Sequence, residues 1–568
     1  MLSLINKLQK HNYYFIVFNI CLSLFLLLEI YLYKSVNFYI IFVTIITLIY
    51  IINRSKNINL IFINSLILFI TLRLIFFVSS HFKIFPFIDT YWELAVVKTF
   101  VDNEKVFAIS DYKGGVSPLE GYSNWPILHI YEYIGVLVSG IDPITLHMFN
   151  LLIIGLLPFV FTYIVIRFIY IKMNLPTEFV YIALIAYATL PDTTYWSIKL
   201  IRNTFGWVFM IMIIFIMLQY HKKPSHIILL FILSAAIVLS HHWSALMLLM
   251  LLLSVYLLTI YKPHNRLTRK TLSFTFIIII AIIMIIWWLY YANILFEMVS
   301  FDRLLNKAST LNIDRWTPRF PPELTPFIWI QILRIKTIIM YIPFILGSYF
   351  IYRLAKSHNK EFVSRIFIFH IVSVLLLFFN LLIDLEPTRV IILLIPFFIT
   401  SLAIFYLQIY IRYKHSIYIL IPFMISTSFI GIFSYSIMPL HLYTNIINPL
   451  DIGEHPNSLY FNSYIKEIDF TTVSSIFSDD TEILAMLLDS SQLHKIEKLS
   501  QESITEEFFR PNSNRIIIIT KDFLVYRYAA GGLSYISYED ALQLRNILKQ
   551  KMINTNLIYN DSHSSIYQ

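Results

Sequence analysis

Long apolar runs, separated by short polar segments, repeat along the chain as far as about residue 438. Most runs hold roughly 17–25 residues, the length at which an α-helix crosses a hydrocarbon core of about 30 Å. The pattern therefore predicts a polytopic α-helical membrane protein with about 13 transmembrane helices. The predicted spans are residues 13–33, 36–53, 58–78, 142–166, 178–196, 204–220, 226–241, 243–261, 271–292, 330–352, 364–384, 390–411 and 416–437.

The composition changes after residue 438, where Asp, Glu, Ser and Asn become frequent and a soluble pattern begins. The predicted strands are 473–477, 515–520 and 556–567 (the last a strand or a hairpin), and the predicted helices are 480–488 and 538–552. Short buried strands that alternate with amphipathic helices are typical of an α/β domain. The chain thus divides into a transmembrane domain, 1–438, and a small C-terminal α/β domain, 439–568.

Lysine and arginine positions predict how the chain is oriented, because the cytoplasmic loops of membrane proteins collect these residues. With the N-terminus in the cytoplasm, every predicted inner loop carries Lys or Arg and almost no acidic residue. This orientation places two large loops, 79–141 and 293–326, and the C-terminal domain on the extracytoplasmic side. The first span has no small-residue cleavage site, so we expect a retained helix of a multi-pass protein of the cell membrane.

Composition agrees with a membrane protein, since 58% of residues are hydrophobic, 14% are charged and the mean hydropathy is +0.71. Soluble globular proteins do not need that much apolar surface. The net charge of +9 is explained by orientation and by lipid headgroups, so we expect membrane lipids and no nucleic acid as partners. The single cysteine, Cys21, lies in the first predicted span and excludes a disulfide framework or a cysteine metal site.

The start of loop 79–141 holds the candidate catalytic residues, Asp89 and Glu93. Carboxylates four residues apart share one face of a helix. Such a pair can bind a divalent cation, or it can divide into a general base and a structural partner. The alternative is a helix N-terminus at which Asp89 is the cap and Glu93 is solvated. Their position directly after a span, at the start of a long outer loop, favours a catalytic function.

Two adjacent histidines, His241 and His242, lie at the outer boundary between two predicted spans. Neighbouring side chains on a helix point about 100° apart, so only one of the two could join a metal site. Asp89 and His242 are the candidate ligands for a divalent cation such as Mg²⁺ or Mn²⁺. Both histidines are also candidates for substrate binding, and the alternative for each is a hydrogen bond to lipid headgroups or a helix cap.

Several cations lie on the outer side, against the positive-inside pattern. The candidates for substrate binding are Lys199, Arg202, Arg334, Lys336 and Arg389. As a group they suit a lipid-linked phosphate or pyrophosphate, to which arginine gives bidentate contacts. Singly, each could pair with headgroup phosphates or nearby acids, and Arg334 and Lys336 could snorkel at a helix end. Glu29, Arg73 and Asp384 also lie in the outer parts of their spans, which indicates a polar cavity that opens outward.

Several common motifs are missing from the sequence. It contains no Gly-rich phosphate loop or Walker pattern, and no Ser/His/Asp order or His-Glu-x-x-His motif. It also contains only 12 glycines, which is few for the Gly-interrupted helices of transporters. The sequence therefore does not indicate a nucleotide-driven pump or one of the common hydrolase mechanisms.

In architecture the chain resembles the GT-C class of integral membrane glycosyltransferases. A span ends just before Asp89, a long outer loop with a short helix follows, and many further spans precede a C-terminal outer domain. Two segments, Arg202-Asn-Thr-Phe-Gly206 and Ser240-His-His-Trp-Ser-Ala245, are similar to those of archaeal-type members. The chain is also distantly similar to protein O-mannosyltransferases and to oligosaccharyltransferase catalytic subunits.

The resemblance implies an inverting glycosyltransferase that takes its sugar from a polyprenyl phosphate, for example dolichyl phosphate. It also implies that Asp89 is the catalytic acid of the first large outer loop. The oligosaccharyltransferase motif Trp-Trp-Asp-Tyr-Gly is missing, since Trp287-Trp288 is followed by Leu289 inside a span. Transfer of a single sugar is therefore expected, and a protein, a lipid and a glycan all remain open as acceptors.

The sequence departs from the class in two other ways. Two spans precede the one that leads to Asp89, and Glu93 is not the adjacent acidic partner found in protein O-mannosyltransferases. Other functions also stay open, namely a translocase or transporter of a lipid-linked saccharide, a polysaccharide polymerase or ligase outside this class, or a non-catalytic assembly subunit.

In the expected mechanism, Asp89 deprotonates an acceptor hydroxyl, directly or by organising a bound metal, and outward cations stabilise the lipid phosphate as it leaves. The hypothesis makes two structural predictions. Residues of one site should converge in an outward cavity, namely Asp89, Arg202, His241, His242 and Arg389. The segment after Pro439 should also fold on the same side as the Asp89 loop.

Overall fold

The computed structural model describes most of the helices and five strands of the chain. The described residues are 12–33, 44, 47, 58–79, 88–104, 106, 124–176, 180–190, 193, 196–197, 200–219, 224–261, 273–290, 344–353, 361–382, 387–413, 475–478, 496–498, 515–520, 557–560 and 564–567. The predicted spans 36–53, 330–352 and 416–437 fall wholly or largely outside these residues. The total number of transmembrane helices therefore stays a prediction.

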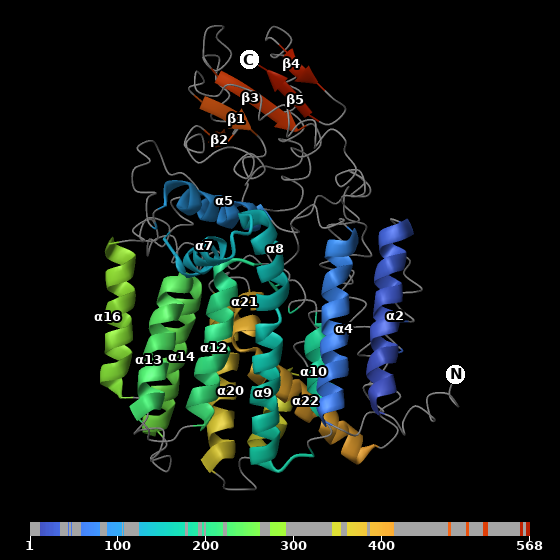
Figure 1. Ribbon diagram of the computed structural model, residues 1–568. Helices are drawn as coiled ribbons and strands as arrows, with labels where there is room; N and C mark the ends of the chain where they lie inside the picture. The colour runs from blue at the N-terminus through green and yellow to red at the C-terminus, as the bar shows by residue number, and fades with distance from the viewer. Residues whose placement is uncertain are drawn as a thin grey trace.

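A bundle of apolar helices makes up the body of the molecule, and most of its helices run side by side along one axis (Figure 1). The helices are α2 (Asn12–Tyr33), α4 (Ile58–Ser79), α8 (Pro143–Ile154), α9 (Leu157–Met173), α10 (Val180–Thr189), α12 (Arg202–Gln219), α13 (Pro224–Ser240), α14 (His242–Tyr261), α16 (Phe274–Tyr290), α20 (Glu361–Leu382), α21 (Pro387–Leu393) and α22 (Ile395–Arg412). Most of them cover all or most of a predicted span, while α8, α9, α10 and α21 each cover part of one.

The helices differ from the predicted spans where proline follows an apolar stretch. Residues 142–166 form two helices, α8 and α9, because Pro158 has no N–H to donate to the carbonyl of Ile154. The helix expected over 178–196 ends at Thr189, two residues before a proline. Hydropathy does not register these breaks, since the residues around them are as apolar as the helices.

Two helices show a lipid-facing surface directly. α16 exposes five isoleucines, each between 41% and 49%, namely Ile278, Ile279, Ile282, Ile285 and Ile286. α13 exposes Ile227, Ile228, Leu229, Phe231 and Ile232. Apolar stripes of this size are rare on soluble monomers, whereas a lipid bilayer covers them at no cost. Within the described residues, the stretches Pro143–Met173 and Arg202–Gln219 are also long and apolar enough to span a membrane.

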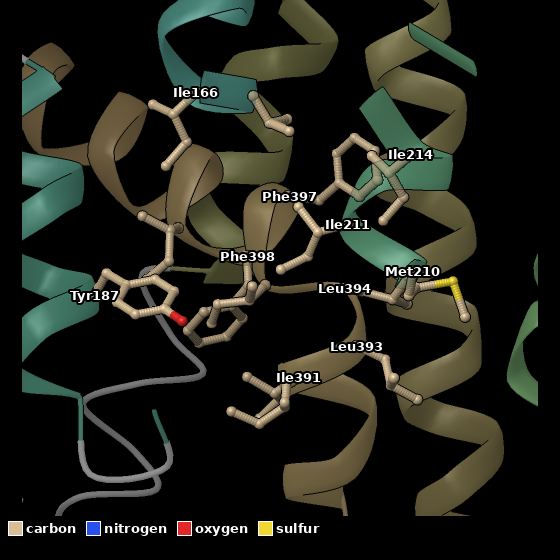
Figure 2. Close-up of a cluster of buried hydrophobic side chains, with 14 of the residues drawn as sticks. Ile166, Tyr187, Met210, Ile211, Ile214, Ile391, Leu393, Leu394, Phe397 and Phe398 are labelled. Atoms are coloured by element: carbon tan, nitrogen blue, oxygen red, sulfur yellow. The ribbon is translucent and has the colours of Figure 1, made fainter. Parts of the chain in front are cut away.

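The centre of the bundle is a tightly packed apolar core, shown in Figure 2. Its labelled residues come from α9, α10, α12, α21, α22 and the turn between α21 and α22, and all are buried: Ile166, Tyr187, Met210, Ile211, Ile214, Ile391, Leu393, Leu394, Phe397 and Phe398. Interiors packed in this way resist deformation. The core therefore holds the ends of α12 and α21 rigidly in place.

Two further helices belong to the predicted outer loop 79–141 and lie across one end of the bundle (Figure 1). They are α5 (Ile88–Asn103) and α7 (Ile127–Ser139). α8 follows directly after α7, and Asp142 caps it by accepting a hydrogen bond from the backbone N–H of Thr145 at 3.1 Å. Loop 79–141 thus contains ordered helices that are fixed to the bundle.

The C-terminal region contains a five-stranded sheet of order β2-β1-β3-β5-β4. The strands are β1 (Ser475–Ser478), β2 (Ile496–Lys498), β3 (Arg515–Thr520), β4 (Leu557–Asn560) and β5 (Ser564–Tyr567). β1 is parallel to β2 and β3, while β5 is antiparallel to both β3 and β4. The strands predicted at 473–477 and 515–520 are present, and 556–567 is a hairpin; the short β2 was not predicted.

The helices predicted at 480–488 and 538–552 lie outside the described residues, so the α/β domain and its boundary at 439 stay predictions. Parallel neighbours such as β1 and β3 need a crossover between them, which is compatible with intervening helices. Figure 1 shows the strands beyond the end of the bundle that carries α5 and α7. This placement agrees with the expectation that the C-terminal segment and the Asp89 loop share one side.

Candidate functional site

A buried ionic cluster joins α5 to two other helices. Glu93 of α5 and His129 of α7 are both 0% exposed, and His129 Nε2 donates to Glu93 Oε2 at 2.6 Å. Arg202 of α12 donates from Nε to the other oxygen, Oε1, at 2.8 Å. The backbone N–H of Arg202 donates to the same oxygen at 3.3 Å. Both carboxylate oxygens of Glu93 are therefore engaged.

This environment keeps Glu93 ionised. Burial acts to raise the pKa of Glu93, but the Arg202 guanidinium and the hydrogen-bonded His129 outweigh it and lower the pKa below the ordinary value of 4.5. A buried carboxylate of this kind needs partners on both oxygens to offset its lost hydration. Of the two roles expected for an acidic pair, Glu93 has the surroundings of the structural partner rather than of the base.

Arg202 also contacts a group of aromatic rings at the same end of the bundle. Its guanidinium carbon lies 5.3 Å from the ring centroid of Trp125, close enough for a cation–π interaction. The Trp125 ring lies 4.7 Å from that of His242, which stacks on His241 at 4.4 Å. Trp287 of α16 donates from Nε1 to the carbonyl of Asn124 at 3.0 Å. The turn before α7 is thus tied to α12, α14 and α16.

The two segments that carry the family resemblance pack directly against each other. Ser244 Oγ of α14 donates to Asn203 Oδ1 of α12 at 2.6 Å. Gly206 is one turn along α12, and a Cβ there would lie 2.7 Å from Ser244 Cβ and 3.2 Å from Ser240 Oγ. The close approach of the two helices is therefore possible because position 206 has no side chain. This close approach of α12 and α14 places Arg202 beside His241 and His242.

Arg389 of α21 lies near the same histidines. Its guanidinium carbon is 5.7 Å from the ring centroid of Trp196, in a second cation–π contact. Arg202 and Arg389 both act electrostatically on His241 and His242. The structure thus brings Arg202, His241, His242 and Arg389 to one end of the bundle, with Glu93 bound to Arg202. The predicted convergence of these four residues with Asp89 in one outward cavity stays a prediction, since the Asp89 side chain lies outside the described part.

The remaining predicted residues are placed less completely. Asp89 lies in the first turn of α5, one helical turn before Glu93, but its side chain is outside the described part. Lys199, Arg334 and Lys336 lie outside the described residues altogether. Their assignment to substrate binding therefore stays a prediction.

The described surroundings of His242 do not suit a divalent cation. Among the described residues, no group of three or more His, Cys, Asp and Glu side chains is close enough to hold a metal ion. His242 lies within the electrostatic influence of two cations, Arg202 and Arg389, which repel a third. Glu93 cannot help, since both of its oxygens are already bound. The predicted metal site at Asp89 and His242 thus gains no support from the residues around His242.

The same surroundings do suit an anion. Three buried ring nitrogens of this cluster have no hydrogen-bond partner within the described part of the chain: Trp125 Nε1, Trp288 Nε1 and His242 Nδ1. Indole nitrogens can only donate, and a buried donor without an acceptor costs free energy. Donors beside two arginines are the groups that a phosphate oxygen requires.

Arg73 has a structural environment. It is 1% exposed and donates from Nη2 to the carbonyls of Leu151, at 3.3 Å, and of Ser197. Gly155 leaves the space that this guanidinium occupies, because a Cβ there would overlap it. Arg73 thus braces α4 against α8 and against the segment next to Trp196.

Sequence reasoning missed the contribution of α7. His129 holds Glu93, and Glu132, three residues later, lies 2.7 Å from Nδ1 of His147 on α8. Asn150 Nδ2 donates to the other Glu132 oxygen at 3.1 Å. The only signal was the spacing of His129 and Glu132 on one face of a helix, which is too common to be specific.

Comparisons with known proteins gave matches among solved structures only. No protein-family model and no curated protein matches the chain. ArnT from Cupriavidus metallidurans bound to undecaprenyl phosphate matches with a TM-score of 0.48 and 10% identity, over 88% of this chain and 97% of that one.

The oligosaccharyltransferase of Archaeoglobus fulgidus matches in two crystal structures, again at 10% identity. The apo form has a TM-score of 0.49 and covers 86% of this chain and 72% of that one. The complex with Zn and sulfate has a TM-score of 0.49 and covers 85% and 70%.

Proposed function

We propose that this protein transfers a sugar from a polyprenyl-phosphate donor to an acceptor at the outer face of a membrane, with Asp89 as the general base. The observation that carries the proposal is the docking of α5. Its first turn contains Asp89, and its buried Glu93 binds Arg202 directly. The helix with the proposed base is therefore held at the end of the bundle where cations gather with N–H donors that have no partner among the described residues.

The proposed reaction is a single displacement at the anomeric carbon. The Asp89 carboxylate accepts the proton of an acceptor hydroxyl, and the hydroxyl oxygen forms a bond to the anomeric carbon. The bond between this carbon and the phosphate oxygen breaks, and the phosphate keeps the electron pair. One displacement from the opposite face inverts the configuration. In this step the chain's own residues supply the base and the charges.

The leaving phosphate needs positive charge and hydrogen-bond donors where its negative charge develops. Arg202 and Arg389 supply the charge, and the Nε1 groups of Trp125 and Trp288 are donors without a partner among the described residues. Lys199, Arg334 and Lys336 are proposed as further cations for the donor. A lipid-linked donor also fits the exposed isoleucine face of α16, the helix that carries Trp288.

The proposal extends to location and to the size of the transferred group. The catalytic end of the bundle and the C-terminal α/β domain are proposed to be extracytoplasmic, with the N-terminus in the cytoplasm. The transferred group is proposed to be one sugar, given the missing Trp-Trp-Asp-Tyr-Gly motif. The acceptor is a protein, a lipid or a glycan.

A transfer assay on purified protein in lipid vesicles tests the function. It offers radiolabelled polyprenyl-phosphate sugars with mixed membrane acceptors to the wild type, to Asp89→Asn and to Asp102→Asn. Asp102 is a matched control, because it lies on the same helix and is exposed. We expect Asp89→Asn to lower transfer by about 10²–10⁴-fold and Asp102→Asn to leave it unchanged. Saturable binding of a lipid-linked glycan without turnover would instead indicate a translocase.

A further inference from the structure

His129 makes two kinds of contact with α5. Besides its hydrogen bond to Glu93, its ring packs edge-on against Phe100, with centroids 6.0 Å apart and an interplanar angle of 83°. Glu93 and Phe100 are seven residues apart, which places them on one face of α5. His129 thus contacts α5 at two residues, Glu93 and Phe100, which lie on one face of α5.

α7 is itself anchored through a second carboxylate–imidazole pair. Glu132 lies 2.7 Å from Nδ1 of His147 and accepts from Nδ2 of Asn150 at 3.1 Å, so one side chain of α7 binds two of α8. All of these groups are buried. α8 continues into α9, whose Ile166 belongs to the central core. A rigid path therefore leads from the core through α8 and α7 to α5.

We infer that His129 is a positioning residue for the proposed sugar transfer, which acts by holding Glu93 and thereby the first turn of α5. Arg202 holds one oxygen of Glu93 from α12, and His129 holds the other from α7. With both contacts in place, α5 is fixed against rotation and against sliding. This inference rests on the proposed function for its effect on rate, but the docking of α5 can be measured without it.

The expected consequence follows from the geometry of a displacement reaction. A misplacement of about 1 Å at the reacting groups lowers a rate by about 10²-fold. Loss of the His129 contact leaves Glu93 paired with Arg202 alone and lets the start of α5 move. The loss should lower kcat and leave the KM for the donor unchanged, since His129 is not among the groups proposed to bind the donor phosphate.

The test compares His129→Ala, His129→Gln and His147→Gln with the wild type and with Asp89→Asn. A glutamine at position 129 keeps an N–H donor for Glu93, so it should restore most of the rate that alanine loses. His147→Gln is the comparison variant for the second pair, because glutamine keeps an N–H donor for Glu132 and should therefore keep α7 anchored. Hydrogen exchange of the α5 amides and the thermal midpoint are measured on every variant.

We expect His129→Ala to lower kcat by about 10²-fold, at unchanged KM, and to speed exchange in α5. We expect His129→Gln and His147→Gln to keep kcat and the exchange rate of the α5 amides near the wild-type values. Wild-type kcat and exchange in His129→Ala, with Asp89→Asn inactive, would overturn the inference and leave the proposed function standing. If the wild type transfers no sugar, the proposed function fails, and the positioning role is then tested by hydrogen exchange alone. Exchange of the α5 amides in His129→Ala that is as slow as in the wild type would overturn the positioning role.

Discussion

The carboxylate of Glu93 lies 2.8 Å from Nε of Arg202, although the two residues are 109 positions apart in the chain. This ion pair joins a helix of the outer loop to a helix of the bundle. It also places the guanidinium of Arg202 against both the carboxylate of Glu93 and the ring of Trp125. The stability of the loop and the charge of the site therefore depend on the same contact.

Glu93→Gln should destabilise the protein. The substitution removes the carboxylate charge that Arg202, whose side chain is 14% exposed, binds through Nε. Breaking a buried pair by removing one partner costs about 3–5 kcal/mol. Thermal unfolding in detergent, followed by helix content, should show a clearly lower midpoint. Glu104→Gln, at an exposed position just after α5, is the control and should unfold like the wild type; equal midpoints for both variants would contradict the prediction.

The carboxylate of Glu93 should also make the stability of the protein depend on pH. Because the pKa of Glu93 is lowered in the folded state from its ordinary value of 4.5, the ion pair contributes fully above pH 4.5. The contribution should fade as the pH falls from 4.5 toward the lower pKa of the folded state. The difference in thermal midpoint between wild type and Glu93→Gln should be constant from pH 7 to about pH 5 and shrink below about pH 4.5. A difference that grows on acidification would refute this assignment.

Gly206→Ala should separate α12 from α14. The added Cβ would lie 2.7 Å from Ser244 Cβ, well inside van der Waals contact, and both atoms belong to rigid parts of their helices. Overpacking of this kind costs about 1–3 kcal/mol. Gly135→Ala is the control, because the added Cβ would meet only the end of the flexible Leu146 side chain. The thermal midpoints of the two variants check the prediction; similar losses in both would mean that the contact at Gly206 is not special.

Trp125→Phe should weaken binding of the donor. The ring that packs on Arg202 and His242 is largely kept, but the Nε1 donor, which has no partner within the described part of the chain, is removed. A hydrogen bond to a charged group contributes about 1.5–3 kcal/mol, so the KM or Kd for the donor should rise by about 10-fold or more. Trp207→Phe is the control, since the Nε1 of Trp207 is also buried and without a partner among the described residues, but lies in the core. An unchanged affinity in Trp125→Phe would remove this donor from the proposed phosphate site.

Much of the helical fold could be predicted, because a helix that faces lipid on one side and the bundle on the other is apolar throughout. The breaks before Pro158 and Pro396 could not be read from hydropathy, since both lie within apolar runs. In the C-terminal region, Arg515–Thr520 was recognised from its isoleucines, while Ile496–Lys498 is too short and too charged to look like a strand.

Part of the candidate site could also be predicted, from the order of the helices along the chain. His241, His242 and Arg202 lie at the ends of consecutive helices, so topology alone places them at one side of the membrane. His129 could not be found in this way, because its value depends on Glu93, 36 residues away, and on how α7 turns in space. No periodicity encodes a contact of that kind.

The backbone N–H of Arg202 is the first amide of α12, and it donates to Glu93. A helix begins with amides that lack an intrahelical acceptor, and here one of them is capped by a residue of another helix. The carboxylate also opposes the positive end of the α12 dipole. The first amide of α12 is therefore capped only when α5, the helix that contains Asp89 in its first turn, is docked against it.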